Sequence, residues 1–439
     1  MHSTFAVYGQ VSLLAIGLVA VLFWVWYDYR SSKKTGSTSC FKADGTPCDL
    51  PEITFNLTLP EARREVFRHP AQTAKLDKRC RFRDLGVRLG GYPTGPNNAI
   101  TDAGVLVGHA TIIEGDGALV PGKGPVRTGV TVIIPHAGDV WNQRATAGHF
   151  VLNGNGSMTG LSWVAESGLL EGPIALTNTH SVGDVYSGLI RWMQEKHPQI
   201  GIEDDTYLPV VGECDDSPLN DIRGLHVTAK HVKDACDSAS AGPVREGAVG
   251  AGTGMTCYEF KGGIGTSSRV VEVGEAKYTV GVLVNCNHGG REQLKMLGVN
   301  VGEVLEAELA TRHTEGSICI VVATDAPLSP TQLDRIAKRA TMGLARTGST
   351  ANHGSGDFVL AFSNGRLVPR KQDGTVQTLP QLSDDEVSAL YAGTAEATEE
   401  AIFNALCAAE TMVGRDGNTS PALPLERVRE LLKQHGHIE

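Results

Sequence analysis

Short runs of apolar and β-branched residues recur along the chain and are bounded by glycine, asparagine or aspartate. Runs of this length and composition are typical of buried strands. The clearest ones lie at residues 103–113, 126–136, 277–287, 317–325 and 357–364.

Helical patterns lie between and after these strands. Residues 329–346 repeat apolar side chains at 333, 336, 340 and 344, with Ser329 as N-cap, Pro330 at the first helical position and Gln332 closing a capping box. A second helix is expected to begin at Ser383, with Glu386 completing its capping box, and a third at 425–434. Buried strands and one-sided helices together predict an α/β fold in which helices cover sheets.

The N-terminus has a different pattern. Residues 7–27 carry no charge and have about the ~20-residue length of a bilayer span, so we expect one transmembrane helix, with a cleavable signal peptide as the alternative. The expected organisation is a membrane anchor at 1–29, a juxtamembrane linker at 30–80 and a compact domain at 81–439. Basic residues after the span favour a cytosolic domain, whereas glycosylation tripeptides at Asn56, Asn155 and Asn418 point the other way. The side of the membrane is therefore left open.

Charge and cysteine spacing exclude some functions. A formal net charge of −10 and the lack of a basic block argue against a nucleic-acid partner. The nine cysteines show no CxxC spacing, so no metal and no cofactor is expected. Cys40 and Cys48 could close a small loop in an oxidising compartment, a pairing left open, and Cys286 and Cys319 are expected to be buried thiols.

Glycine is enriched, with 52 copies among 439 residues, or about 12% against a usual ~7%. The densest string, residues 247–256, lacks the third glycine of a dinucleotide fingerprint. A tight turn that brings backbone close to another segment is therefore favoured over a nucleotide loop. Motifs for a nucleophile elbow, a zinc protease and a P-loop are absent as well.

Ser317 stands between Gly316 and a dense apolar run. Taken alone, it is most simply a loop residue that opens a strand. A second hypothesis is an N-terminal nucleophile, in which cleavage before the serine frees an α-amine that titrates near ~7.7 and can accept the hydroxyl proton at neutral pH. Glycine before the serine would ease the backbone bend that self-attack requires.

Eight segments, in order, resemble the self-processing L-aminopeptidase/D-esterase and β-peptidyl aminopeptidase family. They lie within residues 82–415, at 89–112, 126–136, 153–168, 219–228, 247–269, 280–292, 316–328 and 345–365. The resemblance implies a four-layer αββα sandwich, made as an inactive precursor that cuts itself between Gly316 and Ser317 into an α-chain and a β-chain.

The resemblance also implies roles for individual residues. The family's second serine and acid fall on Ser355 and Asp357, with aspartate where some members carry glutamate. The oxyanion donor falls on Asn287, with Asn285 as the weaker candidate. The acid that receives the substrate ammonium falls on Glu213, and Asp215 stands where some members place a tyrosine beside the oxyanion.

These roles together predict a membrane-tethered serine aminopeptidase or amidase that releases N-terminal residues from peptides, amides or esters. An acyltransferase of the same fold is the alternative, because an amine can resolve an acyl-enzyme in place of water. A catalytically silent binding protein that does not cut itself is a third. We expect small peptides and amino-acid amides or esters as partners and a homo-oligomer of processed heterodimers. The preference among α-, β- and D-residues is not predicted.

Overall fold

A computed structural model describes residues 79–308, 316–371 and 374–438 of the chain, all within one compact unit. The expected membrane span at 7–27, residues 30–78 of the expected linker, and Cys40 and Cys48 lie outside the described residues. Within the described segments, no helix combines the length and apolarity needed to cross a bilayer. The predicted single-pass membrane localisation is corrected accordingly, because it rested on the hydropathy of 7–27 alone and none of these helices supports it.

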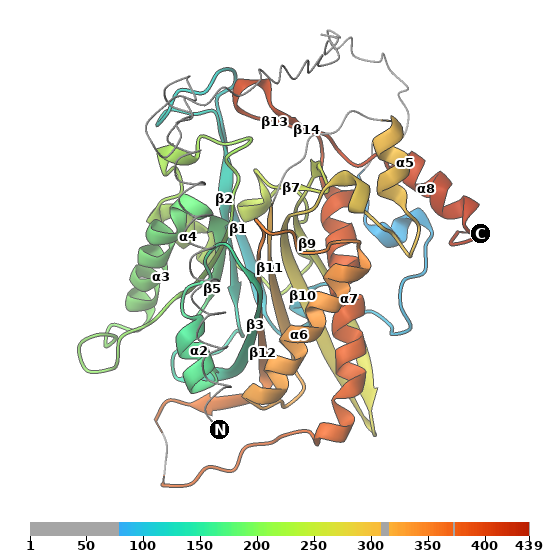
Figure 1. Cartoon of the computed structure of the whole chain (residues 1–439). Coiled ribbons are helices and arrows are strands. Elements are labelled where there is room, and N and C mark those ends of the chain that lie inside the picture. Colours follow the sequence, from blue (N-terminus) through green and yellow to red (C-terminus); the bar gives the residue numbers. More distant parts are fainter. Residues whose placement is uncertain (1–78, 309–315, 372–373, 439) are drawn as a thin grey trace, which may run out of the picture. The chain divides into compact units, whose positions relative to one another are not determined.

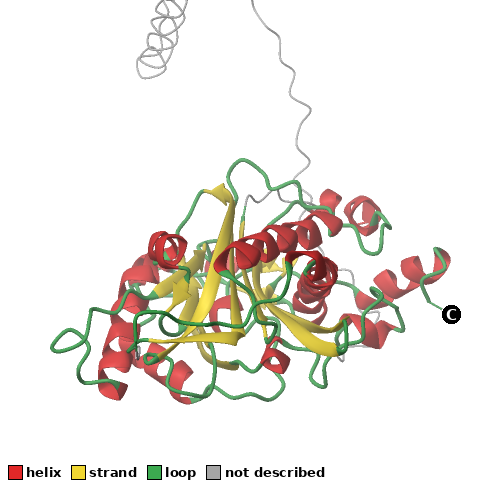
Figure 2. Cartoon of the chain, turned by 90° about the horizontal axis from the view of Figure 1, so that it is seen from below, coloured by secondary structure: helices red, strands yellow, loops and turns green. Residues whose placement is uncertain are grey.

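Two β-sheets stack face to face, and helices cover both outer faces (Figure 1, Figure 2). The four-stranded sheet has the order β1-β2-β5-β6, with β1 Leu106–Glu114, β2 Val126–Ile134, β5 Ile174–Asn178 and β6 Val210–Cys214. The six-stranded sheet has the order β4-β3-β12-β11-β10-β9, with β4 Leu169–Leu170, β3 Gln143–Gly154, β12 Gly356–Pro369, β11 Ser317–Thr324, β10 Ala276–Asn287 and β9 Gly263–Val273. Two short hairpins complete the strands, β7 Thr256–Cys257 with β8 Phe260–Lys261 and β13 Met412–Val413 with β14 Thr419–Ser420.

The helices divide between the two outer layers. The four-stranded sheet is covered by α3 Val182–Lys196 and α4 Ala229–Asp237, and the six-stranded sheet by α6 Pro330–Arg346 and α7 Ser388–Ala408. The remaining helices are α2 Leu161–Ser167, α5 Val301–Glu308 and α8 Leu425–Gln434. One apolar core lies between the two sheets. Each sheet also has one apolar core between it and its covering helices. The order of layers is therefore helix, sheet, sheet, helix, as the resemblance implies.

Local sequence signals account for part of this architecture. Both faces of β2 and β11 are covered, which explains their unbroken apolar runs. Helix α6 has the expected capping box: Ser329 N–H donates to Gln332 Oε1 at 3.0 Å and Gln332 N–H to Ser329 Oγ at 3.4 Å. The box expected at Ser383 is wrong, because Asp384–Glu386 form a 3-10 turn and α7 begins only at Ser388.

Candidate active site

Three neighbouring strands of the six-stranded sheet, β12, β11 and β10, each place one terminus at the same end of the sheet. β10 runs antiparallel to β11, so Asn287 at its end pairs with Ser317 at the start of β11. β11 runs parallel to β12, and Ile318 pairs with Asp357 near the start of that strand. Asn287, Ser317 and Asp357 are far apart in sequence but therefore lie within two successive residue pairs at the same end of the sheet.

Ser317 is half-buried, and its hydroxyl already has a polar partner. The backbone N–H of Gly356 donates to Ser317 Oγ at 3.1 Å. Gly356 lies between Ser355 and Asp357 in the sequence. These two predicted site residues therefore directly flank the N–H that contacts Ser317.

Gly316 packs against the neighbouring strand end. A Cβ atom added to Gly316 would lie 1.7 Å from the Asn287 carbonyl oxygen and 3.1 Å from His288 Cα. The sequence argument for glycine here was backbone bending, whereas the structure shows a close approach of two backbones.

We expect Gly316→Ala to slow self-cleavage at least about tenfold, because a backbone shift costing about 1.4 kcal/mol in the reacting geometry already gives that factor. The fraction of uncut chain over time on a denaturing gel measures the effect. Gly183→Ala is the matched control, since an added Cβ there meets nothing within 4 Å. Processing of Gly316→Ala at the wild-type rate would show that this close approach does not matter for cleavage.

Ser355 and Asp357 form a buried pair. Ser355 Oγ donates to Asp357 Oδ1 at 2.7 Å, and Ser355 N–H donates to the Asn352 carbonyl at 2.9 Å. Burial raises the pKa of the Asp357 carboxyl, and the hydrogen bond from Ser355 opposes that rise. The shorter carboxylate still reaches its serine, so aspartate in place of glutamate keeps the pair intact.

Asn287 is held from both sides of its amide. Thr256 N–H donates to Asn287 Oδ1 at 2.8 Å, and Asn287 Nδ2 donates to the Asp215 carbonyl at 2.9 Å. Because an N–H can only donate, the Thr256 contact fixes which amide atom is oxygen. One hydrogen on Nδ2 remains for a third partner such as an oxyanion.

Asn285 offers no comparable arrangement. It is fully buried, and neither atom of its amide has a hydrogen-bond partner among the described residues. Asn287 is therefore the better placed of the two candidate oxyanion donors.

The glycine string at 247–256 brings Thr256 to this place. Added Cβ atoms would lie 2.4 Å from Ile264 N at Gly252 and 2.2 Å from Arg127 O at Gly254. The backbone of the string is thus in close contact with β9 at Ile264 and with β2 at Arg127, in agreement with the tight-turn interpretation. Lys261 anchors it, donating from Nζ to the carbonyls of Gly252, Met255 and Gly262 at 2.6–2.9 Å.

Glu213 lies in the other sheet, on β6, and faces the same region. The backbone carbonyl of Glu213 accepts from Cys319 Sγ at 3.4 Å, which places β6 against β11. Its carboxylate is buried and accepts from Ser157 N–H at 2.7 Å and from the Thr179 hydroxyl. Burial raises the pKa of Glu213, and these two hydrogen bonds oppose the rise. A buried carboxylate whose hydrogen-bond donors among the described residues are a backbone N–H and a hydroxyl is suited to receive an ammonium group.

Asp215 stands where some family members place a tyrosine beside the oxyanion, and its contacts differ from those expected of that tyrosine. Its side chain is exposed and accepts from Ser217 N–H at 2.8 Å, while its carbonyl holds Asn287. The sequence also left unnamed the partners Thr256, Gly356, Ser157 and Thr179. Three of these, Thr256, Gly356 and Ser157, contribute backbone N–H groups of the kind that any residue carries, so only the glycine strings around them gave a signal.

One group of side chains in the described part of the chain lies close enough to hold a metal ion. It consists of Cys257, Cys286 and His288, all buried. The missing CxxC spacing argued against such a cluster, but its members come from two segments that only the fold brings together.

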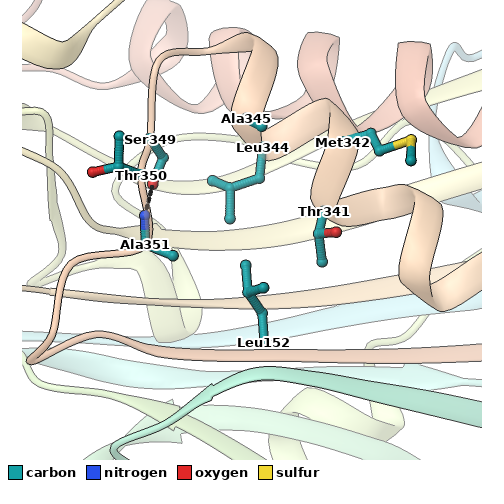
Figure 3. Close-up of a pocket in the computed structure, with 8 residues that line it drawn as sticks. All are labelled: Leu152, Thr341, Met342, Leu344, Ala345, Ser349, Thr350 and Ala351. Carbon is teal, nitrogen blue, oxygen red and sulfur yellow. Dashed lines mark hydrogen bonds between the residues drawn. The ribbon is translucent and has the colours of Figure 1, made fainter.

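A shallow apolar pocket of about 270 Å³ lies between β3, α6 and the turn that follows α6 (Figure 3). Leu152 of β3 faces Leu344 of α6 across it, and the turn at Ser349 and Ala351 closes one end. None of the predicted site residues lines this pocket. It borders the turn that leads to Ser355, and it is not the place where the predicted chemistry would occur.

The chain is similar to known proteins in both sequence and fold. The family model of peptidase family S58 matches residues 98–420. The β-peptidyl aminopeptidase BapA of Sphingosinicella xenopeptidilytica is 46% identical over 368 residues, 80% of this chain and 91% of that protein. A β-aminopeptidase structure from Burkholderia sp. covers 81% of this chain and 99% of its own at 45% identity, with a TM-score of 0.75. The L-aminopeptidase D-Ala-esterase/amidase of Ochrobactrum anthropi, a prototype of the serine aminopeptidases with a variant Ntn hydrolase fold, covers 82% of this chain and 99% of its own at 40% identity and a TM-score of 0.76.

Proposed function

Because this chain belongs to peptidase family S58 and is an aminopeptidase, we propose that it works as a self-processed hydrolase whose nucleophile is Ser317. The observation that carries the proposal is the pairing of Ser317 with Asn287 at the sheet edge, with Gly356 N–H on the serine hydroxyl. The relatives do not favour the acyltransferase alternative.

Maturation would begin with attack of Ser317 Oγ on the Gly316 carbonyl carbon. The acyl group of Gly316 moves from nitrogen to oxygen, and water then hydrolyses the ester. The products are a carboxylate on Gly316, a free hydroxyl on Ser317 and a new α-amine on the same residue. This amine is a base with a pKa near ~7.7 that the precursor lacks.

In the mature enzyme the new α-amine would accept the proton of Ser317 Oγ as that oxygen attacks the substrate carbonyl. Asn287 Nδ2–H and Gly356 N–H would donate to the oxyanion, and the amine would return its proton to the leaving group. Ser355 and Asp357 would orient the amine. Water then releases the acyl group from Ser317.

Glu213 would select substrates with a free N-terminal amine. Its carboxylate is buried, so an incoming ammonium offsets the cost of burying its charge, whereas an acetylated amine does not. Two relatives, 46% and 44% identical, are named β-peptidyl aminopeptidases, so N-terminal β-residues are included among the proposed substrates.

We expect Glu213→Gln to lower kcat/KM for aminoacyl amides by one to two orders of magnitude, which corresponds to the roughly 1.5 to 3 kcal/mol of a hydrogen bond to a charged group. Self-cleavage involves no external amine and should proceed normally. The readout is kcat/KM across a panel of α-, β- and D-aminoacyl amides and their N-acetylated forms. Glu203→Gln, an exposed acid, is the control. Equal turnover of acetylated substrates by the wild type would contradict the role of Glu213.

A further inference from the structure

Two thiols and an imidazole meet on the helix side of β10. Cys257, Cys286 and His288 place one ligand atom each within 4.8 Å of one another. Cys257 Sγ lies 3.9 Å from His288 Nδ1 and 4.0 Å from Nε2. In a tetrahedral zinc site, with Zn–S near 2.3 Å and Zn–N near 2.1 Å, sulfur and nitrogen are about 3.6 Å apart. A contraction of a few tenths of an ångström and a turn of the imidazole ring would bring these three side chains to the spacing of three of the four ligands of such a site.

The backbone around the cluster is built for close approach. Tyr258 and Glu259, which form the turn between β7 and β8, have φ angles of 50° and 58°, a left-handed region that non-glycine residues adopt only at a cost in free energy. A Cβ atom on Gly262 would lie 2.6 Å from Cys257 Cβ and 2.8 Å from the Cys286 carbonyl oxygen. This turn therefore holds Cys257 against the strand that carries Cys286.

The backbone at His288 is held in place as well. Tyr258 N–H donates to the His288 carbonyl at 2.7 Å, and the two rings meet edge to face with centroids 4.9 Å apart.

The charge balance favours a divalent ion. The three side chains are 0%, 0% and 3% exposed, so a lone thiolate among them would be costly. Two thiolates, one neutral imidazole and one Zn²⁺ sum to zero charge. We propose that Cys257, Cys286 and His288 bind a zinc ion. As each Zn–S bond forms, the thiol releases its proton to solvent, and no oxidant or reductant is needed.

Such an ion would stabilise the backbone on either side of Asn287 from the opposite face of the sheet. Cys286 and His288 flank Asn287, and Cys257 follows Thr256, the residue whose N–H holds the Asn287 amide. Side chains alternate along a strand, so these ligands and Asn287 point to opposite faces. The ion would stabilise the junction of the two segments without entering the reaction, and the expected metal-free chemistry is unchanged.

The test uses the full-length chain, produced with added zinc and purified with a phosphine reductant. We expect about one zinc per chain by elemental mass spectrometry, and unfolding followed by refolding with Co²⁺ should give thiolate-to-cobalt charge-transfer absorption. Cys257→Ser and Cys286→Ser should lose most of the metal and lower the midpoint of thermal unfolding. Cys236→Ser and Cys407→Ser, buried thiols outside the cluster, should keep the metal.

Several outcomes would overturn the proposal. The first is a zinc content below about one tenth of an ion per chain in wild type produced with added zinc. The others are the absence of a cobalt–thiolate band and an equal loss of metal in the control variants. A mass lower by two hydrogens in wild type purified without the reductant, with both thiols unreactive, would instead assign a disulfide to Cys257 and Cys286. If the serine variants do not fold, the metal content and cobalt spectrum of the wild type decide alone. These readouts do not depend on Ser317 being the nucleophile.

Discussion

Ser317→Ala is expected to remain a single uncut chain and to lose aminopeptidase activity to the uncatalysed background. The hydroxyl is needed twice, first to attack the Gly316 carbonyl and then to attack substrate, and the α-amine base does not exist until the first step is complete. The loss should therefore exceed that of any other single substitution proposed for the site. A denaturing gel and an aminoacyl-amide assay on the same preparation measure both consequences.

Two further variants keep this result interpretable. Ser317→Cys retains a nucleophile and should recover part of the self-cleavage, which a merely structural role of the serine would not predict. Ser349→Ala removes a hydroxyl from the turn beside the pocket and should be processed normally. Cleavage of Ser317→Ala between residues 316 and 317 would end the N-terminal nucleophile account.

Asn287→Ala is expected to lower kcat by roughly 10² to 10³, because a preorganised donor contributes mainly in the transition state. Its amide is already oriented by Thr256 and Asp215, so no reorganisation is required when the oxyanion forms. The rate should be expressed per cut chain, since the same donor can assist maturation. KM should change little.

Asn285→Ala separates the two asparagine candidates. Asn285 is buried with no partner for its amide among the described residues, and kcat of its alanine variant should stay within a few-fold of the wild type. A fall in kcat from Asn285→Ala with none from Asn287→Ala would transfer the donor role. An effect of Asn287→Ala on KM alone would move Asn287 from catalysis to binding.

The strands and some helix boundaries could be predicted because their causes are local. The capping box of Ser329 and Gln332 and the apolar run after Ser317 each act within a few residues. Ser383 shows the limit of that reasoning, since the same capping pattern there precedes a 3-10 turn and not the first turn of α7. The expected membrane localisation rested on the apolarity of residues 7–27, and no helix in the described part of the chain supports it.

The geometry of the site was less accessible because it depends on long-range register. The pairing of Asn287 with Ser317 follows from how β10 meets β11, and only the resemblance to a family named both residues in advance. Thr256 and Gly356 contribute backbone N–H groups, which have no residue-type signature. The cluster of Cys257, Cys286 and His288 was missed because spacing rules describe ligands that are near in sequence.

N-terminal sequencing of the smaller chain from the purified wild type tests the central claim most directly. The account predicts two chains on a denaturing gel, with the smaller beginning Ser-Ile-Cys-Ile and having the mass of residues 317–439. A fully active protein that remains one chain, or a smaller chain that begins at any other residue, would contradict it.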